Sequence, residues 1–249
     1  MEIIVCIKRA PTTDARIKPA ADGKGYDPAG VNYDISEYDK FAIEAGIQLK
    51  EKHGGKVTVI SLGSTNNTKD IRTAIAMGCD AAFLLVDDAD HDSFATASAL
   101  AAKIKELPHD MVLCGWNSVD KQAAQTGQIM AELLDLPCVT VATGLDVADG
   151  KATVEREIDG GMKEKVVVNL PAVVTCQKGL NNPRSATMKG IMAAKRTKVE
   201  ESPANAPADL LTLVKLSQPP ARPEGKIVGK GAEAVPELVS LLRNEAKVI

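Results

Sequence analysis

The residues that offer chemistry gather in one stretch of the chain, residues 110–128. Its apolar start, from Met111 to Cys114, is too short for a surface helix and predicts a strand buried on both faces. The hydroxyl, amide and carboxylate side chains that follow Gly115 are typical of turns and helix caps. We predict a helix from about Gln122 to Leu134, whose first N–H groups point beyond the strand end. Such a helix start attracts phosphate, and the alternative is an ordinary turn between a strand and a helix.

Other parts of the sequence offer little for catalysis or for metal binding. The histidines His53, His91 and His109 lie in polar turns without a partner at metal-ligand spacing. The five cysteines are scattered and form no CxxC or Cys/His pattern, so we predict buried, reduced thiols. We therefore assign no catalytic residue and no metal ligand.

Composition narrows the class of protein. The chain has 249 residues, 45% of them hydrophobic, with only three Phe, three Tyr and one Trp, so aliphatic side chains must build the core. The net charge of −3 is spread without large blocks and predicts no nucleic-acid binding. No apolar run approaches the roughly 18 residues of a membrane span, and the N-terminus does not resemble a signal peptide. We expect a cytoplasmic or matrix-like protein that does not insert into a membrane.

Strand and helix patterns alternate through the first half of the chain. Helical patterns begin near Ser36, Thr68 and His91 and separate the apolar runs. Strands separated by helices imply a parallel sheet with right-handed crossovers. We therefore predict an α/β fold with a doubly wound, mostly parallel, Rossmann-like sheet. The predicted strands are Glu2–Lys8, Lys56–Leu62, Ala81–Val86 and Met111–Cys114.

The loops after Ile7, Leu62 and Cys114 are the expected ligand-binding loops. Small molecules bind such sheets beyond the carboxyl ends of the strands, where the strand order reverses. These loops can enclose a nucleotide, with the base near the first two and phosphate at the third. They contain no GxGxxG or GxxxxGK[ST] motif, which disfavours dinucleotide binding and ATPase activity.

The second half of the chain has a different pattern. Short alternating runs predict an antiparallel hairpin region made of Val139–Thr143, Thr153–Ile158, Lys163–Val168 and Ala172–Thr175. A polar loop over 176–184 and a short helix over 188–194 follow. A segment rich in proline and serine, Val199–Gly231, predicts an extended arm, and Pro236–Lys247 predicts an amphipathic helix. We predict a domain over 1–198 and a partner-binding arm over 199–249.

Four ordered pieces of the sequence carry a family resemblance. Residues 154–175 resemble the signature of the beta subunit of electron transfer flavoprotein position by position. Residues 71–78, 125–128 and 191–195 are similar to three further segments of that family. The resemblance runs along nearly the whole chain and implies the family's fold, which is similar to adenine nucleotide alpha hydrolases.

The resemblance also implies cofactors and a partner subunit. It implies a heterodimer whose alpha subunit holds the redox-active FAD, while this subunit binds an AMP with a structural role. Ser36-Glu37 stands where relatives commonly have Asn-Pro, and Lys121-Gln122 stands where they commonly run acidic, so the base and phosphate contacts are expected to differ. Carried over from the family, the AMP contacts fall on Cys6, Ser36, Glu37, Tyr38, Asp39, Leu62, Gly115, Trp116, Asn117, Ser118, Val119, Asp120, Lys121, Gln122, Ala123, Ala124, Gln125 and Thr126.

The loop over 176–184 resembles the family's recognition loop. In that loop one leucine enters a pocket of an electron-donating dehydrogenase, and Leu180 matches it, although a loop residue packed on its own chain is the alternative. The implied partners are acyl-CoA or related flavin dehydrogenases, together with a quinone-reducing membrane oxidoreductase.

Two kinds of function fit the resemblance. The first is an electron carrier subunit that is not itself an enzyme. The second is a flavin-bifurcating complex in which this subunit holds a second FAD, in place of AMP, that oxidises NADH. Gln125–Gln128 favours the carrier, because the bifurcating branch more often resembles Gln-Val-Gly-Pro there. A free-standing protein that binds adenine nucleotides is disfavoured by the arm and the hairpin region.

Overall fold

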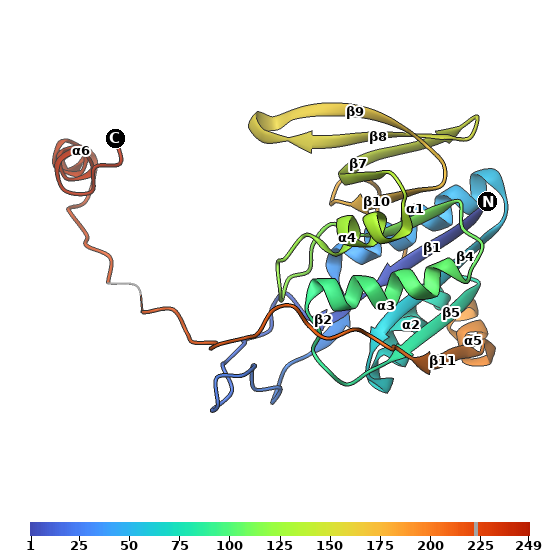
Figure 1. Cartoon of the computed structure of the whole chain (residues 1–249). Coiled ribbons are helices and arrows are strands. Elements are labelled where there is room, and N and C mark those ends of the chain that lie inside the picture. The colour runs from blue at the N-terminus through green and yellow to red at the C-terminus, as the bar shows by residue number, and fades with distance from the viewer. Residues whose placement is uncertain (222–223) are drawn as a thin grey trace.

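A nine-stranded sheet forms the centre of the molecule in the computed structural model (Figure 1). The structure describes residues 1–221 and 224–249, and the remaining two fall within the expected arm. The strand order is β11-β5-β4-β1-β6-β10-β7-β8-β9. The strands are β1 (Glu2–Ile7), β4 (Lys56–Gly63), β5 (Ala81–Val86), β6 (Met111–Gly115), β7 (Cys138–Ala148), β8 (Lys151–Ile158), β9 (Met162–Asn169), β10 (Ala172–Cys176) and β11 (Val199–Pro203).

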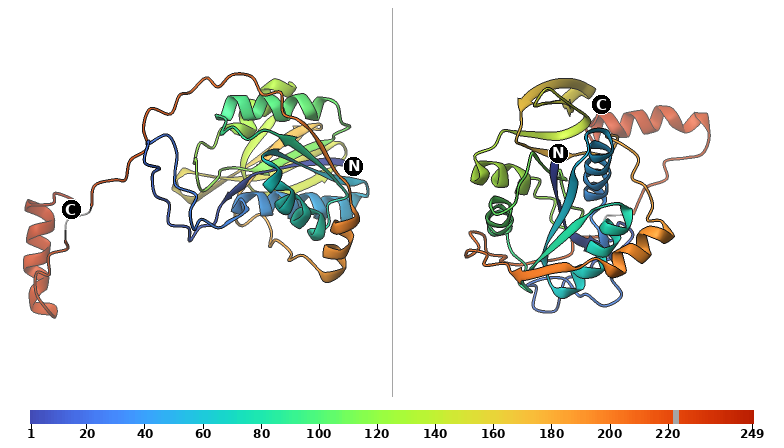
Figure 2. Two further views of the ribbon diagram at one scale, coloured as in Figure 1. Left: turned by 90° about the horizontal axis from the view of Figure 1, so that it is seen from below. Right: turned by 90° about the vertical axis from the view of Figure 1, so that its right-hand side faces the viewer.

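Helices cover both faces of the sheet (Figure 2). One face packs in a single apolar core with α1 (Glu37–His53), α2 (Thr68–Met77) and the buried Ala194 of α5 (Met188–Arg196). The other face packs with α3 (Ser93–Lys105) and α4 (Thr126–Leu134). These helices on both faces confirm the predicted doubly wound α/β fold. A sheet that is buried on both faces requires continuous apolar runs, and its central strands have them.

The strand order reverses beside β1. This strand pairs in parallel with β4 on one side and with β6 on the other, so that Cys6 lies level with Ile60 and with Cys114. The chain fills the β4 side first and then crosses over to the β6 side. The ends of β1 and β6 therefore mark the place at which such sheets bind ligands, and we refer to this place between the loops after β1 and β6 as the crevice.

The hairpin region needs one correction. Strands β7, β8 and β9 form the expected antiparallel meander, with the turn Asp159–Gly161 between β8 and β9. The run that includes Ala172–Thr175 was expected to join them, but β10 lies between β6 and β7 and is parallel to both. All five of its residues are buried, which is typical of a central parallel strand and not of a solvent-facing hairpin.

The polar segment after β1 forms a hairpin excursion. Strands β2 (Arg9–Pro11) and β3 (Tyr33–Ile35) pair antiparallel, and the loop between them extends away from the sheet (Figure 1).

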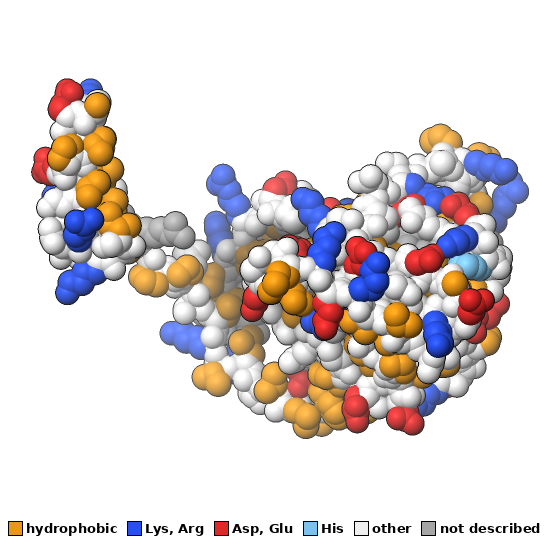
Figure 3. Space-filling model, turned by 90° about the horizontal axis from the view of Figure 1, so that it is seen from above, with side chains coloured by type: hydrophobic (Ala, Val, Ile, Leu, Met, Phe, Trp, Pro, Cys, Tyr) orange, Lys and Arg blue, Asp and Glu red, His pale blue; other side chains and the backbone are white. Residues whose placement is uncertain are grey.

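The C-terminal segment differs in part from the expected arm. Its first five residues form β11, which pairs in parallel with β5 at the edge of the sheet. The chain then lies along the β2–β3 excursion, where the N–H of Leu216 donates to the carbonyl of Gly23 over 2.8 Å. The terminal helix α6 spans Val235–Asn244 instead of Pro236–Lys247, and it stands away from the sheet with apolar side chains exposed along it (Figure 3).

Candidate functional site

A buried carboxylate joins the two strand ends at the crevice. Asp39, in the first turn of α1, accepts the N–H of Lys8 on Oδ2 over 2.7 Å and the N–H of Gly115 on Oδ1 over 2.8 Å. Burial raises the pKa of Asp39 to about 7, although both N–H groups act in the opposite direction. Because both oxygens accept an N–H, the ionised form fits this position, and Asp39 links the end of β1 to the end of β6.

The start of α1 packs directly against the end of β6. A Cβ atom at Gly115 would lie 2.5 Å from Oδ1 of Asp39 and 2.8 Å from Cβ of Tyr38, so no larger residue fits without movement. The rings of Tyr38 and Trp116 meet edge to face, with their centroids 5.4 Å apart. These contacts bring the first turn of α1 and the loop after β6 together on one side of the crevice.

The helix of the opening stretch starts later than expected. α4 begins at Thr126 and not near Gln122, because Gln122 and Ala124 have φ angles of 49° and 50°, which no α-helix contains. Left-handed residues other than glycine cluster at functional sites, since surrounding structure must hold them there. The loop over 116–125 is therefore longer and more irregular than the pattern indicated.

The first turn of α4 is open to a ligand. Its N-cap residue, Gln125, makes no side-chain capping bond, so within the described residues the N–H groups of this turn lack the usual cap. The helix is also seated firmly on the sheet, since a Cβ atom at Gly127 would lie 2.5 Å from Cγ2 of Thr175 and 3.0 Å from Sγ of Cys114. An uncapped helix start beyond strand ends is the kind of position at which proteins bind anions.

The lysines around this loop are paired with acidic side chains. Nζ of Lys8 lies 2.6 Å from Asp120. Burial alone would raise the pKa of Asp120, but the charge of Lys8 and its hydrogen bond lower this pKa, and the net result is below the ordinary value. Nζ of Lys121 lies 2.6 Å from Asp90 and donates to the carbonyl of His91. An anion at this site would therefore meet mainly backbone N–H groups.

Two buried polar atoms beside the crevice have no partner within the described residues. They are Oγ of Ser36, just before α1, and Nε1 of Trp116, just after β6. Buried polar groups are normally hydrogen-bonded, so such groups mark places where a ligand or water binds. An adenine nucleotide carries ring nitrogens, hydroxyls and phosphate oxygens that can pair with both, so the residues present fit such a ligand.

The structure brings only some of the predicted contact residues into the crevice through their side chains. The thiol of Cys6 points into the core, with Sγ 3.9 Å from Sδ of Met130, and burial together with Asp39 raises its pKa to about 12. Leu62 packs with the core around α3 and α4, and Glu37 pairs with Lys40 at 3.3 Å on the surface. Their expected contacts would thus have to be made by backbone atoms.

Lys8 and Gly127 lie at the candidate site but were not among the predicted contacts. Lys8 holds the loop through Asp120, and Gly127 allows α4 to approach β6 and β10. Lys8 could have been found from the sequence, because a lysine at the end of a buried strand is a usable signal. Gly127 could not, because its role depends on which helix packs on which strand.

The predicted docking loop folds back onto the domain. Leu180 is half-buried and packs against the core, which fits its alternative role as a residue packed on its own chain. More exposed apolar side chains lie on α5, where Met188 is 77% and Met192 is 58% exposed. Leu180 is therefore not the most accessible apolar residue in this region.

The arm is attached to the start of α3 through His91. The ring of His91 lies 2.9 Å from Asp87 and 3.3 Å from Asp209 of the arm. Asp92 accepts the N–H groups of Leu210 and Leu211, and Lys121 with Asp90 lies beside the same turn. The hydrogen bond with Asp87 raises the pKa of His91, with Asp209 contributing in the same direction.

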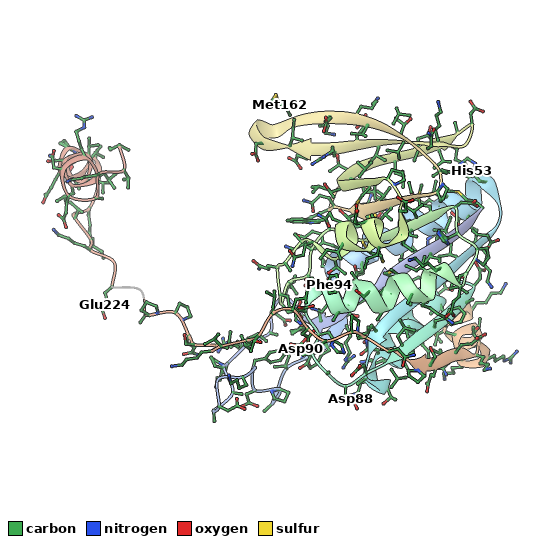
Figure 4. All side chains as sticks on the ribbon, in the orientation of Figure 1. His53, Asp88, Asp90, Phe94, Met162 and Glu224 are labelled. Carbon is green, nitrogen blue, oxygen red and sulfur yellow. The ribbon has the colours of Figure 1, made fainter. Side chains whose placement is uncertain are left out.

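His91 is expected to make stability depend on pH. A raised folded-state pKa means that the stabilisation is complete below the unfolded value of about 6.5 and is lost as the pH rises through the folded-state pKa. His91→Gln should therefore lower the melting temperature at pH 6 more than at pH 8.5, by an amount that corresponds to at most about 1 kcal/mol. Thermal melts across this range test it, with the exposed His53→Gln as control (Figure 4). Equal losses at both pH values would contradict it.

Two kinds of feature are absent from the described parts of the chain. No helix in them is both long and apolar enough to cross a membrane. No cluster of three or more His, Cys, Asp or Glu residues in them is arranged to hold a metal ion.

The fold and the crevice define a doubly wound α/β protein with a strand-end site. Residues 25–207 match the electron transfer flavoprotein domain family, and the chain belongs to this family. It is 40% identical to the electron transfer flavoprotein subunit beta of Bacillus subtilis (strain 168) over 261 aligned residues, which cover 100% of both chains. It is also 40% identical to the subunit beta of Syntrophomonas wolfei over 250 residues (100% of this chain, 98% of the relative), and 33% identical to the mitochondrial subunit beta of Oryza sativa subsp. japonica over 258 residues (100% of both). These relatives support a role in electron transfer, as a carrier subunit.

Proposed function

We propose that this chain is the beta subunit of a heterodimeric electron transfer flavoprotein and that it binds AMP at the crevice between β1 and β6. The observation that carries the proposal is the uncapped start of α4, together with Oγ of Ser36 and Nε1 of Trp116, two buried atoms that have no hydrogen-bond partner among the described residues. The first turn of α4 and the loop before it would hold the phosphate through backbone N–H groups. Residues 36–39 and Trp116 would hold the base and the ribose.

The AMP would have a structural role. It would connect the first turn of α1, the loop after β6 and the start of α4, which Asp39 and Gly127 already hold close together. A ligand that binds only the folded form stabilises that form by mass action. The redox chemistry would be supplied by FAD, held mainly by an alpha subunit, and this chain would contribute to positioning it.

The exposed apolar side chains of the C-terminal segment support the alpha subunit as partner. Leu210, Leu211 and Val214 in the arm are 69%, 68% and 81% exposed, and Leu238 of α6 is 43% exposed. A helix that stands away from its own domain with such side chains exposed gains stability by burying them against another chain. This fits an arm that embraces the partner subunit.

The donor would dock on the segment from Gln177 to Arg196. Its most accessible apolar groups are Met188 and Met192 of α5, and Ile191 and the half-buried Leu180 are less exposed. Acyl-CoA dehydrogenases or related flavin dehydrogenases would deliver electrons here, and a quinone-reducing membrane oxidoreductase would accept them.

The nucleotide identifies the branch of the family. We expect acid treatment of the purified heterodimer to release AMP and FAD in equal amounts. Separation of the released nucleotides by chromatography, with detection by mass spectrometry, measures both. Two FAD molecules per heterodimer without AMP, or oxidation of NADH by the pair, would contradict the proposal and support the bifurcating alternative.

A further inference from the structure

Arg184 binds two carboxylates of α1 at once. Its Nε and Nη2 donate to the two oxygens of Glu44 over 2.8 and 3.0 Å, and its own backbone N–H donates to Glu44 over 3.1 Å. Its Nη1 and Nη2 donate to the two oxygens of Glu51 over 2.6 and 3.0 Å. The guanidinium group is thus bound by a pair of bonds on each of two sides, a geometry that a lysine cannot reproduce.

The loop is attached to α1 at a second point. Nδ2 of Asn181 donates to the carbonyl of Phe41 over 2.9 Å. Phe41, Glu44 and Glu51 are spaced three and seven residues apart, which places them on one face of α1. The loop that carries Leu180 is therefore held along one side of a helix that is itself packed on the sheet.

Electrostatics make the Glu44 contact strong. The side chain of Glu44 is only 4% exposed, and a buried charge is costly unless it is paired. Burial opposes its ionisation, yet hydrogen bonds from Arg184 leave the pKa of Glu44 below its ordinary value. The side chain of Glu51 is 55% exposed, so its loss would not leave a buried charge without a partner.

The helix that follows the loop is anchored separately. The close approach of Gly190 to the carbonyl of Ala76 seats α5 on α2, and Arg72 of α2 donates to the carbonyl of Ala194 near the end of α5. Thr187 caps the first turn of α5 by accepting the N–H of Gly190 over 3.0 Å. The contacts of Arg184 therefore fix the loop itself and the entry into α5, while the remainder of α5 has its own attachment.

We propose that Arg184, clamped between Glu44 and Glu51, is a positioning residue for electron-donor docking, which holds the loop over 177–187 in its binding conformation before the donor arrives. This inference rests on the proposed docking function of the segment. Ordering a loop in advance removes an entropic cost from binding and leaves the chemistry unchanged. Its loss should therefore raise KM for the donor without changing kcat.

The test uses the purified heterodimer and an acyl-CoA dehydrogenase reduced with its acyl-CoA. Glu51→Gln and Arg184→Lys are compared with wild type, and Glu157→Gln, an exposed substitution on β8 outside the docking segment with no ion pair in the described residues, serves as a control for the loss of a negative charge. We expect KM for the dehydrogenase to rise about threefold for Glu51→Gln and about tenfold for Arg184→Lys, with kcat, nucleotide content and the flavin spectrum unchanged. Hydrogen exchange of residues 177–187 in the free heterodimer should become faster in both variants and remain unchanged in Glu157→Gln.

The outcomes separate this inference from the proposed function. If Met188→Ala raises KM while Glu51→Gln and Arg184→Lys keep the wild-type KM, the docking assignment stands and the positioning role of Arg184 is wrong. If none of the three variants changes KM, the docking assignment of the whole segment is wrong. If Glu51→Gln loses thermal stability or bound AMP in proportion to its effect on KM, the contact of Arg184 with Glu44 and Glu51 is purely structural. That result would overturn the inference.

Discussion

Gly115→Ala is expected to disrupt the nucleotide site and to lower the free energy of unfolding by about 1–3 kcal/mol, the usual cost of overpacking. The new methyl group would lie 2.5 Å from Oδ1 of Asp39 and 2.9 Å from its backbone nitrogen. Asp39 cannot retreat without releasing the N–H groups of Lys8 and Gly115. The heterodimer should therefore be isolated with much less bound AMP than wild type.

Gly25→Ala is the matched control for this prediction. The position has the same glycine-to-alanine change, but an added Cβ atom there meets no other atom within 4 Å. Chemical denaturation measures the free energy of unfolding, and acid release measures the nucleotide. Wild-type AMP content in Gly115→Ala would show that the crevice between β1 and β6 is not the nucleotide site.

Met188→Ala is expected to weaken coupling to the donor dehydrogenase about ten- to a hundredfold. Burying a methionine side chain in a partner pocket contributes about 1.5–3 kcal/mol, and Met188 is 77% exposed in the free chain. Leu180→Ala should behave differently, since this half-buried side chain packs against the core. We expect it to lower the free energy of unfolding by about 1–2 kcal/mol, less than the 2–5 kcal/mol of a fully buried leucine.

Two measurements distinguish these residues. Steady-state electron transfer at varied donor concentration reports docking, and thermal melting of the heterodimer reports stability. If Leu180→Ala changes the donor dependence and leaves stability unchanged, Leu180 is the docking residue and its packing in the free chain is incidental. A wild-type donor dependence in Met188→Ala would exclude Met188 from the interface.

Much of the fold was predictable because local pattern and burial agree. The apolar runs of β1, β4 and β5 form strands at nearly the expected residues, and the helix expected to begin near Thr68 is α2, which begins at that residue. A strand buried on both faces must be apolar throughout, so its pattern survives in the sequence. The pattern of a strand does not show which other strand it pairs with. For this reason β10 was grouped with the hairpins, although it is parallel to β6 and β7.

The candidate site divides in the same way. The strand ends, the polar loop after β6 and the helix that follows are readable from residue types, because turn formers and capping residues act locally. The start of α4 was misplaced because Gln122 and Ala124 adopt left-handed conformations. Contacts with residues distant in the sequence hold such conformations, and the residue types Gln and Ala do not indicate them.

By itself the sequence determined that this protein is a doubly wound α/β domain with its ligand loops at the strand ends, and that it resembles the electron transfer flavoprotein beta subunit. Only the tertiary structure decided that Asp39 joins β1 to β6, that Arg184 ties a distant loop to α1, and that Met188 lies exposed while Leu180 packs inward. The physical reason is the range of the interactions. Periodicity and turn chemistry act between neighbours in the chain, whereas a buried ion pair or a shared carboxylate depends on which distant segments the fold brings within about 3 Å of each other.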